Sequence, residues 1–183
     1  MRFIVGITGA SGSIYGLQLL ESLKKSGADV TIIASKTGLE ILKMETGMGK
    51  EGLASYGRLL DNQDLMAPMA SGSNTFDAVV VAPCSMKTLA CIANGLASSL
   101  MVRVAEVALK ERRKLVLVTR ETPLSLIDIK NMEMVTLAGG VVLPACPGFY
   151  HSPRTMEDLV DHVVGKVLDQ IGVEHSLFKR WGQ

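Results

Sequence analysis

Apolar residues along the chain follow two alternating patterns, and each pattern predicts a different kind of element. Short, mostly apolar runs predict buried strands at residues 2–8, 29–34, 77–82, 115–119 and 140–143. Between these runs apolar residues recur at helical spacing, which predicts helices at residues 13–26, 36–45, 86–93, 100–111, 124–138 and 155–171. Residues 47–72 have weak periodicity, which fits either a long active loop or a helix that the pattern does not reveal.

Strands that alternate with helices indicate βαβ units, which build a parallel sheet with right-handed crossovers. The run after Asp77 is apolar at every position, as expected for a strand covered on both faces, and Pro83 is expected to end it. Five or six strands are too few for an eight-stranded barrel. The predicted fold is therefore α/β, a single domain over residues 1–183 with an open, doubly wound and mostly parallel sheet flanked by helices.

Composition excludes several classes of function. The chain has 183 residues, 48% hydrophobic and 20% charged, which is enough for one sizeable core. A net charge of +1 and few aromatic residues give no argument for binding nucleic acid or an anionic membrane. No apolar run approaches a membrane span, and glycines from Gly6 onward interrupt any signal-peptide pattern. Cys84, Cys91 and Cys146 have apolar neighbours, so we expect buried, reduced thiols in a cytoplasmic protein.

Ligands of a doubly wound sheet bind beyond the carboxyl ends of its strands, so the segments after the predicted strands are the place to look. These segments read TGASGS, ASKTG, APCSMKT, TRETPLS and PACPGFYH. Most of them are rich in hydroxyls, small residues or cations. The candidate site is therefore predicted at this edge of the sheet.

The first segment, GITGASGSIYG, matches neither the G-x-G-x-x-G fingerprint nor the P-loop pattern. Gly9 and Gly12 permit unusual backbone angles, which favours close approach of a ligand. Ser11 and Ser13 add hydroxyl groups where a helix begins, which favours binding of a phosphate. The alternative is a tight turn in which Ser13 caps the helix.

The segment APCSMKT repeats this logic after the third predicted strand. Ser85 can cap the next helix, and the first amides of that helix, with Lys87 and Thr88, could hold a second anion. Simple capping is the alternative. Cys84 has no nearby histidine to act as its base, so we expect a packed thiol and not a nucleophile.

Two further segments carry charge. In TRETPLS, Arg120 and Glu121 point to opposite faces of an extended chain, which leaves Arg120 available for a phosphate or carboxylate and Glu121 for a proton. A surface pair is the alternative. The basic run LKERRK falls at the end of a predicted helix, where the helix dipole and solvation explain most such runs.

The segment PACPGFYHSPRT is stiffened by its prolines. Phe149 and Tyr150 could close over an apolar ligand, with a hydroxyl donor on Tyr150. His151 and His162 lack cysteine or carboxylate partners at metal-ligand spacing, so we expect no zinc site. His175 is expected to be solvated.

Taken together, GITGASGSIYG, PCSMKTLA, ALKERRKLVLVTRETPLS, PGFYH and the terminal LFKRW resemble the UbiX family of flavin prenyltransferases over nearly the whole chain. Members of that family are similar to flavodoxin-like or Rossmann-like flavoproteins and usually form dodecamers. The resemblance implies that a dimethylallyl group passes from dimethylallyl monophosphate to N5 and C6 of reduced FMN without a metal ion. The product would serve UbiD-type decarboxylases.

The resemblance also implies roles for individual residues. The positions that match FMN contacts are Gly9, Ala10, Ser11, Ser35, Ser85, Met86, Lys87, Thr88 and Arg120. Tyr150 and Lys166 match the binding of the prenyl phosphate, although many members have arginine where Lys166 stands. Lysine keeps the charge but loses the bidentate fork of arginine. The positions that match catalytic residues are Ser11, Glu45, Lys110 and Glu121.

The reaction gives these residues physical tasks. Lys110, Tyr150 and Lys166 would stabilise the departing phosphate, and Ser11 could help to protonate it. Either Glu121 or the released phosphate would take the flavin proton. Because aromatic residues are few, the prenyl pocket is expected to use neighbouring subunits, with residues 172–183 packed on a neighbour and Trp181 as a wall or as ordinary packing.

Two other functions compete with this interpretation. An FMN-dependent cysteine decarboxylase of the related group relies on a histidine after the first helix and on a P-x-M-N-x-x-M-W motif, and the sequence has neither. A non-catalytic flavin carrier is also compatible with the sequence, but it would leave Lys110, Glu121, Tyr150 and Lys166 without a task. A turnover assay separates all three.

Overall fold

Six parallel strands form the centre of the computed structural model, which describes residues 1–182. They run in the order β3-β2-β1-β4-β5-β6. Their bounds are β1 (Arg2–Ile7), β2 (Asp29–Ala34), β3 (Arg58–Asp61), β4 (Ala78–Cys84), β5 (Lys114–Thr119) and β6 (Val141–Pro144). This is the strand order of a doubly wound sheet whose direction of winding reverses between β1 and β4, so the predicted fold class is confirmed.

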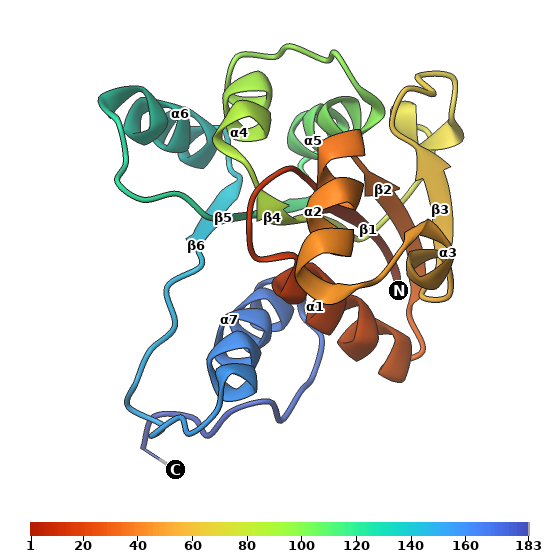
Figure 1. Ribbon diagram of the computed structural model, residues 1–183. Coiled ribbons are helices and arrows are strands. Elements are labelled where there is room, and N and C mark those ends of the chain that lie inside the picture. Colours follow the sequence, from red (N-terminus) through yellow and green to blue (C-terminus); the bar gives the residue numbers. More distant parts are fainter. Residues whose placement is uncertain (183) are drawn as a thin grey trace.

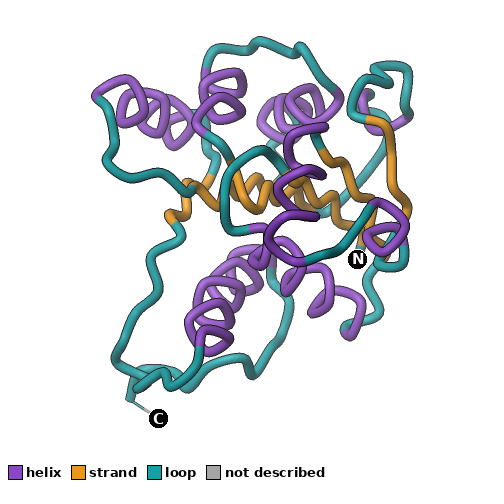
Figure 2. The backbone as a smooth tube through the Cα atoms, viewed as in Figure 1, coloured by secondary structure: helices purple, strands orange, loops and turns teal. Residues whose placement is uncertain are grey.

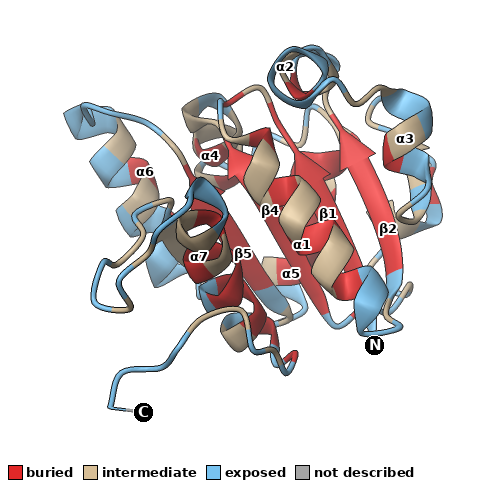
Figure 3. Cartoon of the chain, turned by 60° about the horizontal axis from the view of Figure 1, so that its bottom comes forward, coloured by how far each residue is buried: buried red, intermediate tan, exposed pale blue. Residues whose placement is uncertain are grey.

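Helices cover both faces of the sheet (Figure 1). They are α1 (Ser13–Lys25), α2 (Lys36–Thr46), α3 (Lys50–Ala54), α4 (Met86–Ala93), α5 (Leu100–Lys110), α6 (Leu126–Leu137), α7 (Met156–Ile171) and the 3-10 turn η1 (Pro68–Ala70). The helices α1 and α7 pack on one face and α4 and α5 on the other, each with its own apolar cluster. Figure 3 shows that the central strands β1, β2, β4 and β5 are buried along nearly their whole length, which explains their apolar runs.

Residues 47–72 contain more structure than their sequence pattern indicates: α3, the edge strand β3 and η1. The strand β3 pairs in parallel with β2 from Thr31–Arg58 to Ala34–Asp61. It has four residues and is exposed at both ends, so it carries too few buried positions to show a period. Its carboxyl end delivers Asn62 and Gln63 to the same edge as the other strands.

The end of β4 corrects one prediction. Pro83 was expected to end the strand, but β4 continues to Cys84, with an irregular register against β5 between Val81 and Cys84. Proline has no N–H for the ladder, which accounts for the irregularity without ending the strand. Cys84 is fully buried, and burial raises the pKa of its thiol to about 12, so the expected packed thiol is confirmed.

The other thiols differ from the expectation of burial. Cys91 is half-buried, and Cys146 is exposed in the loop after β6, so the prediction is wrong for Cys146. All three cysteines are free. Within residues 1–182, no helix is long and apolar enough to cross a membrane.

Candidate active site

Three helix N-termini converge on one cavity at the carboxyl edge of the sheet. The cavity has a volume of about 390 Å³. Each helix is capped by a serine hydroxyl: Ser35 accepts from Gly38 N at 3.0 Å, Ser85 from Thr88 N at 3.3 Å and Ser99 from Val102 N at 3.5 Å. The lining residues are Gly9, Ser35, Lys36, Thr37, Asn62, Gln63, Ser85, Lys87, Thr88, Cys91, Ser98, Ser99 and Val102.

Helix N-termini present unpaired N–H groups and the positive ends of helix dipoles, so this cavity suits an anion. Lys36 and Lys87 add positive charge. Gly9 lies so close to α2 that a Cβ atom on it would stand 2.8 Å from Thr37 Cγ2. The expected role of Ser85 as a cap is confirmed, and Ser35 caps α2 in the same way. The cavity also brings Lys87 and Thr88 together with Gly9.

The N-terminus of α1 is occupied by a side chain of the chain itself. The Glu45 carboxylate, at the end of α2, accepts hydrogen bonds from Gly12 N at 3.1 Å and from Ser13 N at 2.8 Å. Partial withdrawal from water raises the pKa of Glu45, but hydrogen bonds from Ser11 and from the amides of Ser13 and Gly12 outweigh it and leave that pKa below its usual value. The anion at this turn is therefore Glu45, which meets Ser11 there, and we call residues 8–13 together with the Glu45 carboxylate the Glu45 turn.

Gly12 precedes α1 with a φ of 103°, a left-handed conformation that favours glycine. The alternative in which Ser13 caps this helix is wrong, because Ser13 lies inside α1 and Gly12 holds the cap position. Ala10 is buried in the same turn, and Ser11 is exposed at its tip. Met86, at the start of α4, packs against the apolar cluster on that face.

A buried threonine that the sequence analysis missed joins the two central strands. The Thr8 hydroxyl donates to Pro83 O at 2.8 Å and accepts from Ser85 N at 2.8 Å. It therefore fixes the turn after β1 against the turn after β4, where the sheet reverses its winding. Its position directly after a strand was the only signal in the sequence. Asn62 and Gln63 were missed for a similar reason, since β3 itself was not recognised.

Arg120 and Glu121 follow β5 directly. Within residues 1–182 no ion pair joins them, and Glu121 is exposed, with its carboxylate accepting from Thr122 N at 3.1 Å. The Arg120 Nε atom is buried and has no partner within that range. A Cβ atom on Gly12 would lie 4.0 Å from Arg120 Cγ, so Arg120 stands beside the Glu45 turn. A second cavity, of about 360 Å³, is lined in part by Arg120 and Glu121.

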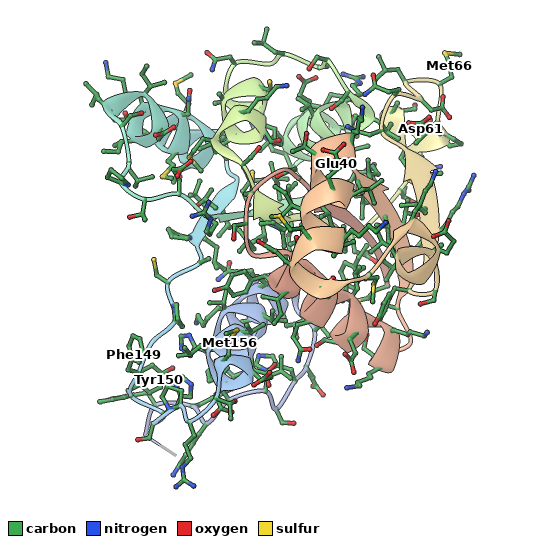
Figure 4. The ribbon with its side chains drawn as sticks, in the orientation of Figure 1. Glu40, Asp61, Met66, Phe149, Tyr150 and Met156 are labelled. Carbon is green, nitrogen blue, oxygen red and sulfur yellow. The ribbon has the colours of Figure 1, made fainter. Side chains whose placement is uncertain are left out.

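Tyr150 and Lys166 belong to a different region, around α7. Tyr150 lies on the long loop between β6 and α7, which Figure 2 shows beside the C-terminal segment. Figure 4 shows Phe149 and Tyr150 far from Glu40 on α2. The Tyr150 hydroxyl lies 3.2 Å from His162 Nε2, and Lys166 follows His162 by one helical turn. Within residues 1–182 no hydrogen bond or ion pair connects Tyr150 or Lys166 to the Glu45 turn.

The C-terminal tail, residues 172–182, packs on α7 of the same chain. Arg180 and His175 both bond to the Asp169 carboxylate, at 2.8 and 3.2 Å, and Lys166 lies 3.7 Å from it. The expectation that His175 is solvated is wrong, because its side chain is 5% exposed. Trp181 meets the Tyr150 ring edge-on at 5.4 Å. Contact of residues 172–183 with a neighbouring subunit stays a prediction, and Gln183 lies outside the described residues.

Lys110 lies at the opposite edge of the sheet from the helix N-termini. It ends α5, next to the amino end of β5, and pairs with the neighbouring Glu111. Arg113 of the same basic run has a structural task, because it donates to Gly72 O at 2.7 Å and Asn74 O at 2.8 Å. Within one chain Lys110 is therefore separated from the other predicted catalytic residues. Among residues 1–182 no cluster of histidine, cysteine and carboxylate side chains could hold a metal ion.

Comparison with known proteins identifies the family. The family model described as Flavoprotein matches residues 1–168. The flavin prenyltransferase UbiX of Methanocaldococcus jannaschii is 48% identical over 183 residues, covering 100% of this chain and 99% of the relative.

Two solved structures are similar over the whole chain. A crystal structure of AnUbiX (PadA1) in complex with FMN and dimethylallyl pyrophosphate has a TM-score of 0.97 and 40% identity, covering 100% of this chain and 97% of that one. A dodecameric FMN-dependent UbiX-like decarboxylase from Escherichia coli O157:H7 has a TM-score of 0.97 and 42% identity, covering 100% of both chains. The chain therefore belongs to the Flavoprotein family and, within it, to the UbiX flavin prenyltransferases.

Proposed function

We propose that the protein binds FMN at the carboxyl edge of its sheet and joins a dimethylallyl group to the reduced flavin. The observation that carries this proposal is the cavity of about 390 Å³ where the capped starts of α2, α4 and α5 meet Lys36 and Lys87. A phosphate suits that set of donors. Arg120, with its buried and unpartnered Nε, supplies a further donor for the same ligand or its neighbour.

The bound flavin supplies the nucleophilic N5 and C6 positions to which the prenyl group is joined. The residues of the chain have simpler tasks around it. Gly9, Ala10, Ser35 and Met86 shape the binding surface, and Ser85, Lys87, Thr88 and Arg120 donate hydrogen bonds or charge. Ser11 is held at the turn by the Glu45 carboxylate, where it can pass a proton to the departing phosphate. Glu121 is an exposed carboxylate near Arg120 and can accept a proton.

Tyr150, Lys166 and Lys110 are assigned to the phosphate of the prenyl donor, whose negative charge grows as the carbon–oxygen bond breaks. Lys110 lies at the amino edge of the sheet in its own chain, so it can serve only the site of another copy. A homododecamer would supply that copy. Three points stay predictions. They are that the donor is dimethylallyl monophosphate, that a UbiD-type decarboxylase receives the product, and that the protein is cytoplasmic.

Mixing two inactive variants tests the shared site. Lys110→Ala and Tyr150→Phe each remove one of the residues assigned to the phosphate of the prenyl donor. If each site takes Lys110 from one copy and Tyr150 from another, mixed oligomers will contain some sites in which both residues are intact. We expect the mixture, after dissociation and reassembly, to recover part of the wild-type rate. A mixture that stays as inactive as its components would show that one chain supplies both residues.

An anaerobic incubation tests the reaction itself. The purified protein is mixed with reduced FMN and dimethylallyl monophosphate, and the released flavin is analysed by mass spectrometry. We expect a flavin heavier by one five-carbon unit. Unmodified FMN, with a control prenyltransferase active in the same buffer, would contradict the proposal and favour a flavin carrier. Cysteine peptides in a parallel incubation test the decarboxylase alternative.

A further inference from the structure

The hydrogen bond between Tyr150 and His162 has a direction that the structure fixes. The His162 Nδ1 atom accepts a hydrogen bond from the backbone N–H of Gly148 at 3.1 Å. A neutral imidazole whose Nδ1 accepts carries its proton on Nε2. His162 Nε2 lies 3.2 Å from the Tyr150 oxygen, so Nε2 donates and the hydroxyl accepts. The proton of the Tyr150 hydroxyl therefore remains available for another acceptor.

The surroundings of His162 favour this neutral form. The residue is buried on α7, with its ring stacked on His151 at 5.0 Å and against Phe178 at 4.8 Å. Burial, and then the positive charges of His151 and Lys166, lower the pKa of His162 below its usual value. A protonated Nδ1 would also place a second donor against the Gly148 N–H.

Other titratable groups face the same cluster from the tail. The His175 ring lies 5.4 Å from the Phe178 ring, which packs against His162, and the Arg180 guanidinium lies 5.7 Å from the centre of the same Phe178 ring. Both are paired with Asp169. Arg180 adds a positive charge on the tail side of the cluster, while the carboxylates of Asp169 and, beside His151, of Asp158 lie nearby.

We propose that His162 is a positioning residue that holds the Tyr150 hydroxyl as a hydrogen-bond donor toward the phosphate of the prenyl substrate. This rests on the proposed function, which assigns Tyr150 to that phosphate. Tyr150 is 46% exposed and lines an open cavity of about 370 Å³ beside Lys179 and Arg180, so an anion can reach it. Lys166, one turn along α7 from His162, adds a cation on the same helix face.

The hydrogen bond from His162 favours phosphate binding because it leaves the Tyr150 hydroxyl only one role, that of a donor. A free phenol hydroxyl can either donate or accept, and a phosphate oxygen needs it to donate. His162 Nε2 donates its own proton to the Tyr150 oxygen. The hydroxyl proton therefore points away from His162. Protonation of His162 would break the Gly148 contact and loosen the arrangement.

Nitrogen NMR on the FMN-loaded protein tests the tautomer without any turnover. His162 is assigned by comparing the ¹⁵N-histidine spectrum with that of His162→Gln. At pH 7.5 we expect the neutral form with its proton on Nε2. A proton on Nδ1, or a charged imidazole at that pH, would overturn the proposal whether or not the protein transfers a prenyl group.

Two substitutions at His162 separate positioning from packing. In His162→Gln the amide oxygen can accept from Gly148 and the amide nitrogen can donate to Tyr150, so the polarity of both contacts is kept. In His162→Phe the ring still packs against Phe178, but both hydrogen bonds are lost. We expect the affinity for dimethylallyl monophosphate, measured by calorimetry, to fall about tenfold in His162→Phe and to stay within about threefold in His162→Gln.

The controls keep the test independent of folding. FMN affinity should be unchanged in both variants. His151→Gln removes the ring that stacks on His162 and meets Tyr150 edge-on, but it leaves both hydrogen bonds of His162 in place, so it should bind the prenyl phosphate normally. In a Tyr150→Phe background the difference between the two His162 variants should vanish. Equal losses in His162→Gln and His162→Phe, or a difference that survives Tyr150→Phe, would refute the positioning role.

The pH dependence gives a second readout. Between pH 7.5 and 5.5 the wild-type affinity should fall more steeply than that of His162→Gln, because only the wild type has an imidazole at position 162 to protonate, whereas His151 and His175 are present in both proteins. The titration of the phosphate itself contributes equally to both proteins. Identical pH profiles would contradict the proposal.

Discussion

The Glu45 turn and the region around α7 both contain residues assigned to the reaction, but they are held in different ways. At the Glu45 turn each side chain bonds to backbone groups: Glu45 to the start of α1, and Thr8 to the turn after β4. Around α7 the contacts join side chains of a loop, a helix and the tail, such as Tyr150, His162 and Trp181. The first region is fixed by the sheet, while the second depends on how the tail lies on α7.

This difference assigns two kinds of task. The rigid edge, with its helix N-termini, suits a ligand that is held firmly, as a flavin is. The region around α7 includes two long segments without regular structure, the loop before α7 and the tail (Figure 2). It therefore suits a part of the site that admits a substrate and releases a product. Changes at the edge should therefore alter stability and turnover, and changes around α7 should alter mainly the binding of the prenyl phosphate.

The largest effect is expected from Glu45→Gln. The amide keeps the shape but loses the charge that the amides of α1 stabilise and that holds Ser11. We expect FMN to stay bound and turnover to fall about a hundredfold, as for loss of an acid–base group. Steady-state kinetics and flavin fluorescence measure the two quantities. Wild-type turnover would remove Glu45 from the mechanism.

The same variant carries a pH prediction. Because the folded-state pKa of Glu45 is lowered, its contribution to stability is fully present above the unfolded value and is lost as the pH falls through the folded value. In Glu45→Gln this part of the acid dependence should be absent. Thermal unfolding of both proteins between pH 6 and pH 3 provides the comparison, and parallel curves would speak against the lowered pKa.

Thr8→Val should have the next largest effect, on stability. It leaves Ser85 N without its acceptor in a buried place, which costs about 1–3 kcal/mol. The matched control is Thr119→Val, because the Thr119 hydroxyl is buried without a partner among residues 1–182 and its loss should be nearly neutral. Urea denaturation of both variants measures the difference. Equal free energies of unfolding would mean that Thr8 does not join the two strands.

Gly165→Ala should affect the α7 region alone. A Cβ atom there would lie 2.4 Å from Phe178 Cε1, so the tail must move. We expect the Michaelis constant for the prenyl phosphate to rise about threefold to tenfold, with unchanged FMN affinity, because one charge-assisted hydrogen bond is weakened. Gln170→Ala, at an exposed position of the same helix, serves as the control. Loss of FMN binding in Gly165→Ala would contradict the separation of the two regions.

The smallest effect concerns the thiols and needs no substitution. Cys84 is fully buried in β4 with a pKa of about 12, whereas Cys146 is exposed in the loop after β6. At pH 8 an alkylating reagent should label Cys146 readily and Cys84 only on unfolding. Mass spectrometry of peptides after a short exposure measures both. Rapid labelling of Cys84 would show that the edge opens more easily than its contacts indicate.

Local patterns determined much of this protein. The apolar run after Asp77 predicted a strand covered on both faces, and Ser85 predicted a helix cap, because each of these features depends on a few consecutive residues. The strand β3 was not predicted, because four residues at the edge of a sheet are too few to show a pattern of apolar residues. Pro83 led to a wrong strand end because proline usually ends a strand, whereas here the register of β4 against β5 shifts at the proline and the strand continues.

Only the tertiary structure decided which groups meet. Glu45 and Ser13 are 32 residues apart, and nothing local shows that a carboxylate from α2 occupies the start of α1. His175 was expected in water but is buried against Asp169, since the tail folds back on α7. The tautomer of His162 likewise depends on Gly148, which lies 14 residues away on a loop. Hydrogen-bond partners are set by distance in space, and the sequence alone specifies such distances only within one element.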